Sequence, residues 1–270
     1  MKTKVFLFLL FVCFVSAGRA AVVDTLKVYS KSMKKDVKVV AVIPEKTKSN
    51  LPVLYLLHGY GGDAKTWVNI RPDLPEIAEQ YGMMIICPDG KNSWYWDSPK
   101  DPSSRYETFV SDELIEYVDS HYATCKSKEG RAITGLSMGG HGAMWLALRH
   151  TDVFGAAGST SGGVDIRPFP NNWEMAKQLG KECDNRDIWD EHTAINQIDR
   201  LKNGDLAIII DCGYDDFFFE VNNNFHEKLL KYKIDHDFIV RPGEHNGAYW
   251  YKSIPYQILF FHNYFKSKSK

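Results

Sequence analysis

A serine between glycines is the first residue whose surroundings point to chemistry. Residues 135–139 read Gly-Leu-Ser-Met-Gly and match the pattern Gly-x-Ser-x-Gly, in which a sharp turn from a strand into a helix exposes a serine hydroxyl. Residues 131–134 before the turn are strand-like, and the Ala/Leu/Met-rich residues 140–149 after it are helix-like. Because a side chain at either glycine would crowd so tight a turn, we predict that Ser137 is a nucleophile.

A serine hydroxyl needs a base that removes its proton and an acid that orients the base. An aspartate-rich loop follows the apolar residues 206–210, and a turn-rich loop follows the strand-like residues 236–240. Of the nine histidines, His245 alone lies in a turn-rich loop after the last expected strand, and we predict that it is the base. Two adjacent carboxylates cannot both point at its ring. We predict that Asp216 is the acid, with Asp215 as the alternative.

Acyl transfer passes through a tetrahedral oxyanion, which backbone N–H groups can stabilise. The residue after the nucleophile, Met138, supplies one such N–H in a turn of this kind. The second donor is expected from the glycine-rich residues 58–62, which directly follow an apolar, strand-like run. We predict that Tyr60 provides this second N–H, with Gly59 as the alternative, and that His58 orients the loop.

The elements that must position these residues alternate along the chain. Short apolar runs, several of them continuous as in parallel strands covered on both faces, predict strands at 37–43, 52–57, 83–87, 131–134, 155–159, 206–211 and 236–240. Apolar stripes predict helices at 105–121, 225–233 and 249–265. The alternation predicts an α/β fold with a mostly parallel central sheet and helices on both faces. Residues 163–204 break the rhythm, and we interpret them as an insertion near the edge of the sheet that binds ligands.

The N-terminus has the pattern of a secretory signal peptide. A cationic head precedes the apolar residues 5–15, and small residues follow up to Ala20. The apolar run is shorter than the roughly 20 residues that cross a bilayer, and no later stretch approaches that length. We therefore predict a signal peptide at 1–20 and one domain at 21–270 that is exported to the periplasm or secreted, without a stable membrane span. A lipid anchor at Cys13 is the alternative.

Composition narrows the remaining classes. The 33 Lys and Arg residues nearly balance the 34 Asp and Glu residues, so the basic surface of a nucleic-acid-binding protein is not expected. Histidines and cysteines lack ligand spacing, so we predict neither a metal nor a cofactor. An exported protein can form disulfides. Cys87 and Cys212 end apolar runs and are expected to be buried thiols, whereas Cys125 and Cys183 lie in polar segments and could pair. The sequence does not indicate an oligomeric state.

Several of these motifs together resemble the esterase D family of α/β hydrolases. The resemblance rests on Leu-Leu-His-Gly-Tyr-Gly-Gly at 56–62, Gly-Leu-Ser-Met-Gly-Gly at 135–140 and Gly-Glu-His at 243–245, supported by residues 92–99 and 212–217. The family includes S-formylglutathione hydrolases, tributyrin esterases, feruloyl and acetylxylan esterases, and mycolyltransferases. It implies an α/β-hydrolase fold over about 22–265, with Asp216 as the catalytic aspartate and Tyr60 and Met138 as oxyanion donors. Many members have a tryptophan soon after the histidine, whereas here Trp250 comes five residues later.

Aromatic side chains suit flat acyl groups or the faces of sugars. The candidates for substrate contacts near the sheet edge are Trp94, Trp96, Trp173 and Tyr214. We predict a serine carboxylic ester hydrolase that removes feruloyl or acetyl groups from plant polysaccharide or oligosaccharide through an acyl-serine intermediate. The only partner expected is a small-molecule or saccharide ester. The alternatives are a hydrolase of S-formylglutathione or small thioesters, and an acyltransferase that delivers to a sugar hydroxyl.

Overall fold

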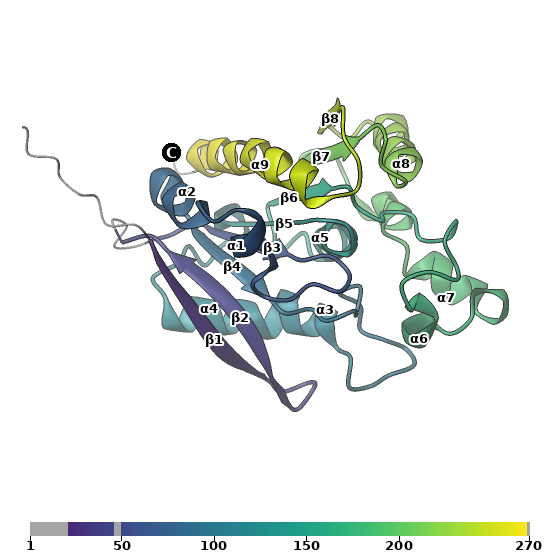
Figure 1. Cartoon of the computed structure of the whole chain (residues 1–270), viewed down its shortest axis with the longest axis horizontal. Helices are drawn as coiled ribbons and strands as arrows, with labels where there is room; N and C mark the ends of the chain where they lie inside the picture. The colour runs from purple at the N-terminus through teal and green to yellow at the C-terminus, as the bar shows by residue number, and fades with distance from the viewer. Residues whose placement is uncertain (1–20, 46–49, 269–270) are drawn as a thin grey trace, which may run out of the picture.

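One eight-stranded sheet forms the centre of the protein (Figure 1). The computed structural model describes residues 21–45 and 50–268, so the signal peptide expected at 1–20 lies outside the described residues. The strands lie in the order β1-β2-β4-β3-β5-β6-β7-β8. Their bounds are β1 Val22–Ser30, β2 Lys35–Ile43, β3 Val53–Leu57, β4 Met84–Pro88, β5 Arg131–Gly135, β6 Ala156–Thr160, β7 Ala207–Gly213 and β8 Asp237–Arg241.

The sheet is mostly parallel, as predicted. Strands β3 to β8 are parallel to one another. Strand β2 is antiparallel to both of its neighbours, β1 and β4. Every residue of β3, β4, β5 and β6 is buried. The unbroken apolar sequences of β3 and β4 follow from that position, because helices cover both faces of a parallel sheet.

Two groups of helices cover the two faces of the sheet. The helices α1, α2 and α9 enclose one core cluster, and α3, α4, α5 and α8 contribute to the other. Figure 1 shows α9 and α2 on one side of the sheet and α4 on the other. The helix bounds are α1 Thr66–Ile70, α2 Leu74–Tyr81, α3 Tyr106–Thr108, α4 Leu114–His121, α5 Met138–Arg149, α6 Met175–Leu179, α7 Arg186–Glu191, α8 Phe219–Lys231 and α9 Gly247–Lys268.

The structure departs from the sequence expectations at several elements. The helix expected at 105–121 is divided, because a π-helical segment at Phe109–Glu113 separates α3 from α4. Strand β1 was not expected, since most of its side chains are exposed and leave no apolar run. Helix α8 begins at Phe219 rather than near Phe225. Residues 163–204 contain α6, α7 and two 3₁₀ turns between β6 and β7, in keeping with an insertion.

Two expectations that follow from export concern disulfides and membrane-spanning helices in the described residues. Cys87, Cys125, Cys183 and Cys212 are free thiols, so the disulfide considered between Cys125 and Cys183 is not formed. Cys87 and Cys212 are buried, as expected from the apolar runs that they end. Within residues 21–45 and 50–268, no helix combines the length and apolar character needed to cross a membrane.

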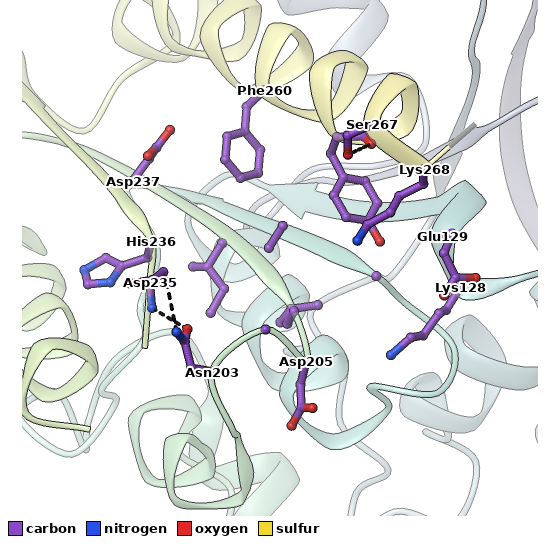
Figure 2. Close-up of a pocket in the computed structure, with 16 residues that line it drawn as sticks. Lys128, Glu129, Asn203, Asp205, Asp235, His236, Asp237, Phe260, Ser267 and Lys268 are labelled. Carbon is purple, nitrogen blue, oxygen red and sulfur yellow. Dashed lines mark hydrogen bonds between the residues drawn. The ribbon is translucent and has the colours of Figure 1, made fainter. Parts of the chain in front are cut away.

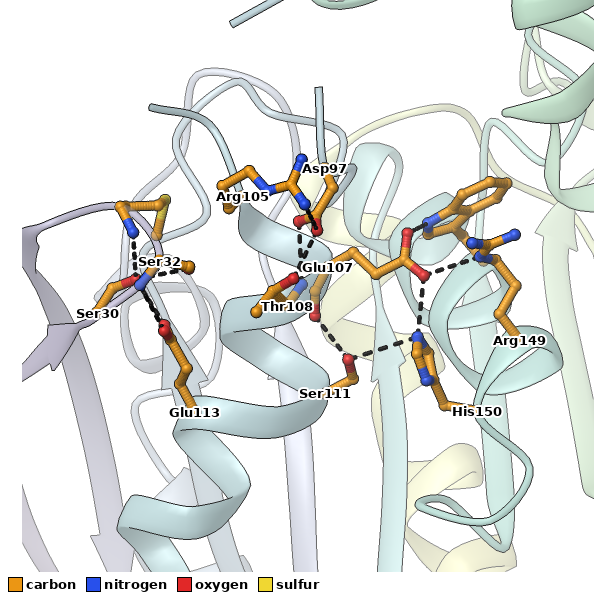
Figure 3. Close-up of polar contacts among 12 residues, drawn as sticks. Ser30, Ser32, Asp97, Arg105, Glu107, Thr108, Ser111, Glu113, Arg149 and His150 are labelled. Carbon is orange, nitrogen blue, oxygen red and sulfur yellow. Dashed lines mark hydrogen bonds and ion pairs between the residues drawn. The ribbon is translucent and has the colours of Figure 1, made fainter. Parts of the chain in front are cut away.

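A buried carboxylate in α3 ties this helix to α5, the helix that follows Ser137 (Figure 3). Glu107 in α3 accepts hydrogen bonds from Trp145 Nε1 at 2.9 Å and Arg149 Nε at 2.8 Å, and it pairs with His150 Nε2 at 2.9 Å. Three partners on or directly after α5 thus converge on one side chain. Since a buried charge is tolerated when it is paired and hydrogen-bonded, this network fixes the position of α5 against α3.

Candidate active site

Ser137 lies in a strained turn between β5 and α5. Its φ of 55° and ψ of −117° are unusual for a residue other than glycine, and such strain persists only where the surroundings hold it in place. A Cβ atom at Gly135 would lie 2.5 Å from backbone atoms of Gly139, and one at Gly139 would lie 2.5 Å from the carbonyl oxygen of Leu57. The turn therefore requires both glycines, for the reason that the sequence indicated.

The structure brings Ser137, His245 and Asp216 into one hydrogen-bonded line. His245 Nε2 lies 2.9 Å from Ser137 Oγ, and His245 Nδ1 lies 3.0 and 2.9 Å from the two carboxylate oxygens of Asp216. A carboxylate can only accept, so Nδ1–H donates to Asp216 and Nε2 is left to accept the serine hydroxyl proton. The three side chains follow β5, β7 and β8 and meet at the carboxyl edge of the sheet.

The three aspartates of the β7 loop have different surroundings. The side chain of Asp216 is fully buried, and its Oδ1 also accepts the Phe218 N–H at 2.8 Å. Asp215 is exposed. Asp211 is buried at the end of β7, where the Tyr249 hydroxyl and the Arg241 guanidinium hold its carboxylate. Of the three, Asp216 is the one that contacts the imidazole.

The loop at 58–62 lies against the serine turn. A Cβ atom at Gly59 would lie 2.5 Å from Leu136 Cδ1 and 3.2 Å from Ser137 Cβ, so a side chain there would displace the Leu136 side chain. His58 Nδ1–H donates to the Gly59 carbonyl at 2.7 Å, and His58 Nε2 accepts the Gly90 N–H at 2.9 Å. Both ring nitrogens are occupied, which suits a residue that holds the loop and not one that transfers protons.

Two backbone amides beside Ser137 have no internal partner. Within the described residues we find no hydrogen-bond acceptor for the N–H of Tyr60 or of Met138. Met138 is the first residue of α5, and the first amides of a helix have no acceptor within the helix and carry its positive dipole end. An anion beside Ser137 would therefore meet favourable donors.

A cavity of about 340 Å³ contains the serine and the histidine. Trp173, from the insertion, stacks on Phe217 with ring centroids 5.7 Å apart, and Phe217 lies 4.2 Å from the His245 ring. Trp250 packs edge-on against the His245 ring, with ring centroids 5.1 Å apart. The lining residues are Gly59, Tyr60, Gly62, Thr66, Leu136, Ser137, Trp173, Phe217, His245 and Trp250.

Of the four aromatic residues expected to contact substrate, only Trp173 is among the described residues that line the cavity. Trp173 lines it, but Trp94 and Trp96 are 1% and 0% exposed and stack on each other at 5.6 Å in the core. Tyr214 is 51% exposed and is not part of the lining. The lining residues Phe217 and Trp250 were not expected, although Phe217 directly follows Asp216, a position that could have indicated it.

Burial keeps two titratable neighbours of the site uncharged. His141, one turn after Ser137, donates from Nδ1 to the Gly163 carbonyl at 3.0 Å, and burial lowers its pKa to about 3. Burial likewise raises the pKa of the Cys212 thiol, near Asp216. Neither group carries charge at neutral pH. Within the described residues, no three His, Cys, Asp or Glu side chains are grouped as metal ligands.

A hollow of similar size lies at the opposite edge of the sheet (Figure 2). It measures about 380 Å³ and is lined by residues at the amino ends of β7 and β8, including Asn203 and Asp235, and by Phe260 of α9. The Asn203 side-chain amide donates to the Asp235 carboxylate, and its oxygen accepts the Asp235 backbone N–H, both at 2.9 Å. The hollow shares no residue with the Ser137 cavity, so its size alone does not make it the site.

Comparisons with known proteins agree with this geometry. An acetyl esterase of Caldicellulosiruptor saccharolyticus is 26% identical over 254 residues, which cover 84% of this chain and 92% of that protein. The solved structure of a ferulic acid esterase matches with a TM-score of 0.78 at 26% identity, covering 91% of this chain and 100% of the other. An S-formylglutathione hydrolase from Staphylococcus aureus matches with a TM-score of 0.78 at 22% identity over 90% of this chain and 100% of that chain, a likeness of fold.

The family comparison covers most of the chain. The family model described as putative esterase matches residues 30–261, which include both glycine-rich loops and the turns after β7 and β8. The fold is that of the α/β hydrolases, as the resemblance in the sequence implied. The chain belongs to the putative esterase family.

Proposed function

We propose that the protein is an exported serine carboxylic ester hydrolase whose triad is Ser137, His245 and Asp216. The observation that carries the proposal is the position of His245, 2.9 Å from Ser137 Oγ on one side and 2.9 Å from Asp216 on the other. This is the arrangement that activates a serine hydroxyl for acyl transfer. The domain at 21–270 would act after removal of the leader at 1–20.

The reaction follows from the roles that the geometry allows. Ser137 Oγ attacks the ester carbonyl while His245 Nε2 accepts the hydroxyl proton, and Asp216 stabilises the imidazolium that results. The N–H groups of Tyr60 and Met138 bind the oxyanion of the tetrahedral intermediate. His245 then protonates the leaving alcohol, which leaves an acyl group on Ser137. Water, deprotonated by His245, releases the acid and restores the serine.

The cavity favours uncharged, flat acyl groups. Its walls are the rings of Trp173, Phe217 and Trp250, and among its described lining residues none carries a charge other than His245 when protonated. Aromatic walls suit a planar feruloyl ring and leave room for acetyl. The acetyl esterase and ferulic acid esterase relatives support the same two acyl groups. We therefore propose feruloyl or acetyl esters of plant polysaccharide or oligosaccharide as substrates.

Two other reactions use the same acyl-enzyme. The S-formylglutathione hydrolase likeness raises a small thioester as substrate, but the leader proposed at 1–20 would take the protein away from a cytosolic thiol pathway. An acyltransferase would differ only in the acceptor, a sugar hydroxyl in place of water. Acyl transfer to added oligosaccharide, measured beside hydrolysis, separates this alternative from the esterase.

A substrate panel tests the proposal. We expect turnover of methyl ferulate, acetylated xylan and short p-nitrophenyl esters to exceed that of S-formylglutathione in kcat/KM. Activity should rise from acid toward neutral pH, because the base must be unprotonated to accept a proton. The proposed function would be overturned if S-formylglutathione were the best substrate. It would also be overturned if activity were constant between about pH 5 and 8.

A further inference from the structure

The loop that presents the Tyr60 N–H is gripped by one neighbouring segment, residues 90–95. The Gly90 N–H donates to His58 Nε2 at 2.9 Å, and the Tyr95 hydroxyl donates to the His58 carbonyl at 3.1 Å. Beyond Tyr60, the Gly61 N–H donates to Asn92 Oδ1 at 2.9 Å. Residues 90–95 therefore hold the loop on both sides of Tyr60.

Asn92 restrains the part of the loop that has little other support. Gly61 is exposed, has a φ of 74°, and has open space where a side chain would lie. Its neighbour Gly62 closes a turn onto the Gly59 carbonyl at 3.0 Å. The contact from Asn92 therefore ties the Gly61 backbone directly to residues 90–95.

The gripping segment is itself held in an unfavourable conformation. Trp94 and Tyr95 have φ values of 57° and 62°, in the left-handed region that residues with side chains rarely adopt. Ser93 stabilises this turn, since its hydroxyl donates to the Gly90 carbonyl at 2.6 Å and accepts the Tyr95 N–H at 3.0 Å. Strain of this kind gathers where a rigid geometry is needed.

The insertion supports the same segment from outside. Trp173 and Glu174 also have positive φ values, 47° and 55°, and the Trp94 indole N–H donates to the Trp173 carbonyl at 3.4 Å. The Glu174 carboxylate interacts with the Tyr60 hydroxyl and with the Asn92 side chain. Two strained pairs are thus joined beside the loop by the bond between Trp94 and Trp173.

We propose that Asn92 is a positioning residue of the reaction: its amide oxygen holds the Gly61 N–H and thereby keeps the Tyr60 N–H directed at the oxyanion. The proposal rests on the acyl-transfer function proposed for Ser137. Asn92 touches no reacting atom. It acts on the transition state, because negative charge develops on the carbonyl oxygen there and is absent from the bound ester, and it leaves the binding of the ester in the ground state nearly unchanged.

The test compares Asn92→Ala and Asn92→Ser with Asn224→Ala, which alters an exposed asparagine on α8. We expect both Asn92 variants to lose about tenfold in kcat on p-nitrophenyl acetate, less than the roughly 100- to 1,000-fold cost of removing an oxyanion donor outright. KM should stay within about twofold, because ground-state binding is retained. Asn224→Ala should match the wild type in both constants.

Inhibition by trifluoroacetophenone gives a readout that general loosening of the fold would not move. Its carbonyl carbon takes up the Ser137 oxygen while the hydroxyl proton passes to His245, so its oxyanion occupies the Tyr60 and Met138 site. Its inhibition constant should rise in proportion to the loss in kcat/KM, as for a transition-state analogue. The inhibition constant of acetophenone, which is far less prone to this addition, should stay unchanged.

A charge-balanced pair of variants checks that the acceptor oxygen is what matters. Asn92→Asp combined with Glu174→Gln keeps an oxygen facing Gly61 and leaves the net charge unchanged, so its kcat should return to that of Glu174→Gln alone. An unchanged kcat in Asn92→Ala, or a loss confined to KM, overturns the positioning role. If Ser137→Ala stays inactive in that case, the proposed function survives; if Ser137→Ala is active, the function itself has failed.

Discussion

At the scale of residues, Asp215 and Asp216 are adjacent in the chain but differ in burial and in partners. The Asp216 carboxylate is buried against His245 Nδ1, whereas Asp215 is exposed. We predict that Asp216→Asn lowers kcat by about 10,000-fold, because an amide no longer holds the required tautomer of the base. Asp215→Asn should stay within about twofold of the wild type. Steady-state kinetics on p-nitrophenyl acetate measure both variants, and a larger loss in Asp215→Asn would make that residue the acid.

Local patterns predicted the three side chains that the structure brings together, whereas burial determines which of the expected aromatic residues line the cavity. Ser137, His245 and Asp216 lie in turns whose glycines and flanking strands can be recognised from a few adjacent residues. Trp94 and Trp96 have the same composition as a binding surface, yet the long-range packing of the core encloses them. No local pattern distinguishes a tryptophan that packs in a core from one that lines a cavity, so this part of the site needed the structure.

At the scale of elements, the turn from β5 into α5 depends on close backbone contacts. We predict that Gly139→Ala destabilises the protein by about 3 kcal/mol, because the new methyl group would overlap the Leu57 and His58 carbonyl oxygens. The matched change is Gly247→Ala at the start of α9, where a Cβ atom would have no neighbour within 4 Å. Urea denaturation compares the two variants. Equal midpoints would show that the turn can absorb a side chain.

Glu107, which links α3 to α5, should make the stability of the folded protein fall at acid pH. Burial alone would raise the pKa of Glu107, but hydrogen bonds from His150 and Arg149 outweigh it and lower the pKa below the ordinary 4.5. The folded state therefore favours the ionised form. This contribution is fully present above pH 4.5 and is lost as the pH falls through the folded-state pKa.

Two variants isolate this contribution. We predict that Glu107→Gln costs roughly 3 kcal/mol at neutral pH, as expected for a broken buried pair, and that its deficit relative to the wild type shrinks as the pH falls below 4.5. Glu116→Gln, which alters an exposed pair with Lys31, should be nearly neutral. Denaturant melts at several pH values give both differences. A deficit for Glu107→Gln that is constant down to about pH 3 would rule out the linkage.

The elements that could be predicted are those with strong local periodicity. Strands β3 and β4 are continuously apolar, and β7 is apolar up to Ile210, because both of their faces are covered. Strand β1 pairs along its whole length with β2 but faces solvent on most positions, so its sequence carries no alternation. The π-helical segment at Phe109–Glu113 lies within one continuous apolar stripe. The side-chain period there suits an α-helix, and only the three-dimensional packing reveals the interruption.

At the scale of the whole molecule, the proposed leader defines the N-terminus of the mature protein. Ala21, the first residue after the proposed cleavage site, is buried in the core and Val22 opens β1. We predict that the full chain, expressed in a bacterium that exports it, is recovered with Ala21 at its N-terminus. N-terminal sequencing and intact mass measure this. An uncut Met1, or a lipid-modified Cys13, would contradict the export proposal and leave the hydrolase proposal untouched.

In the proposed mechanism, Ser137 carries the acyl group. The most direct measurement is turnover of p-nitrophenyl acetate by Ser137→Ala beside the wild type, with mass spectrometry of wild-type protein quenched during turnover. We predict a loss in kcat of at least roughly a thousandfold in the variant and one acetyl group on the wild-type peptide that contains Ser137. Retention of more than a few per cent of the wild-type rate, or an acetyl group on another residue, would contradict the acyl-serine mechanism.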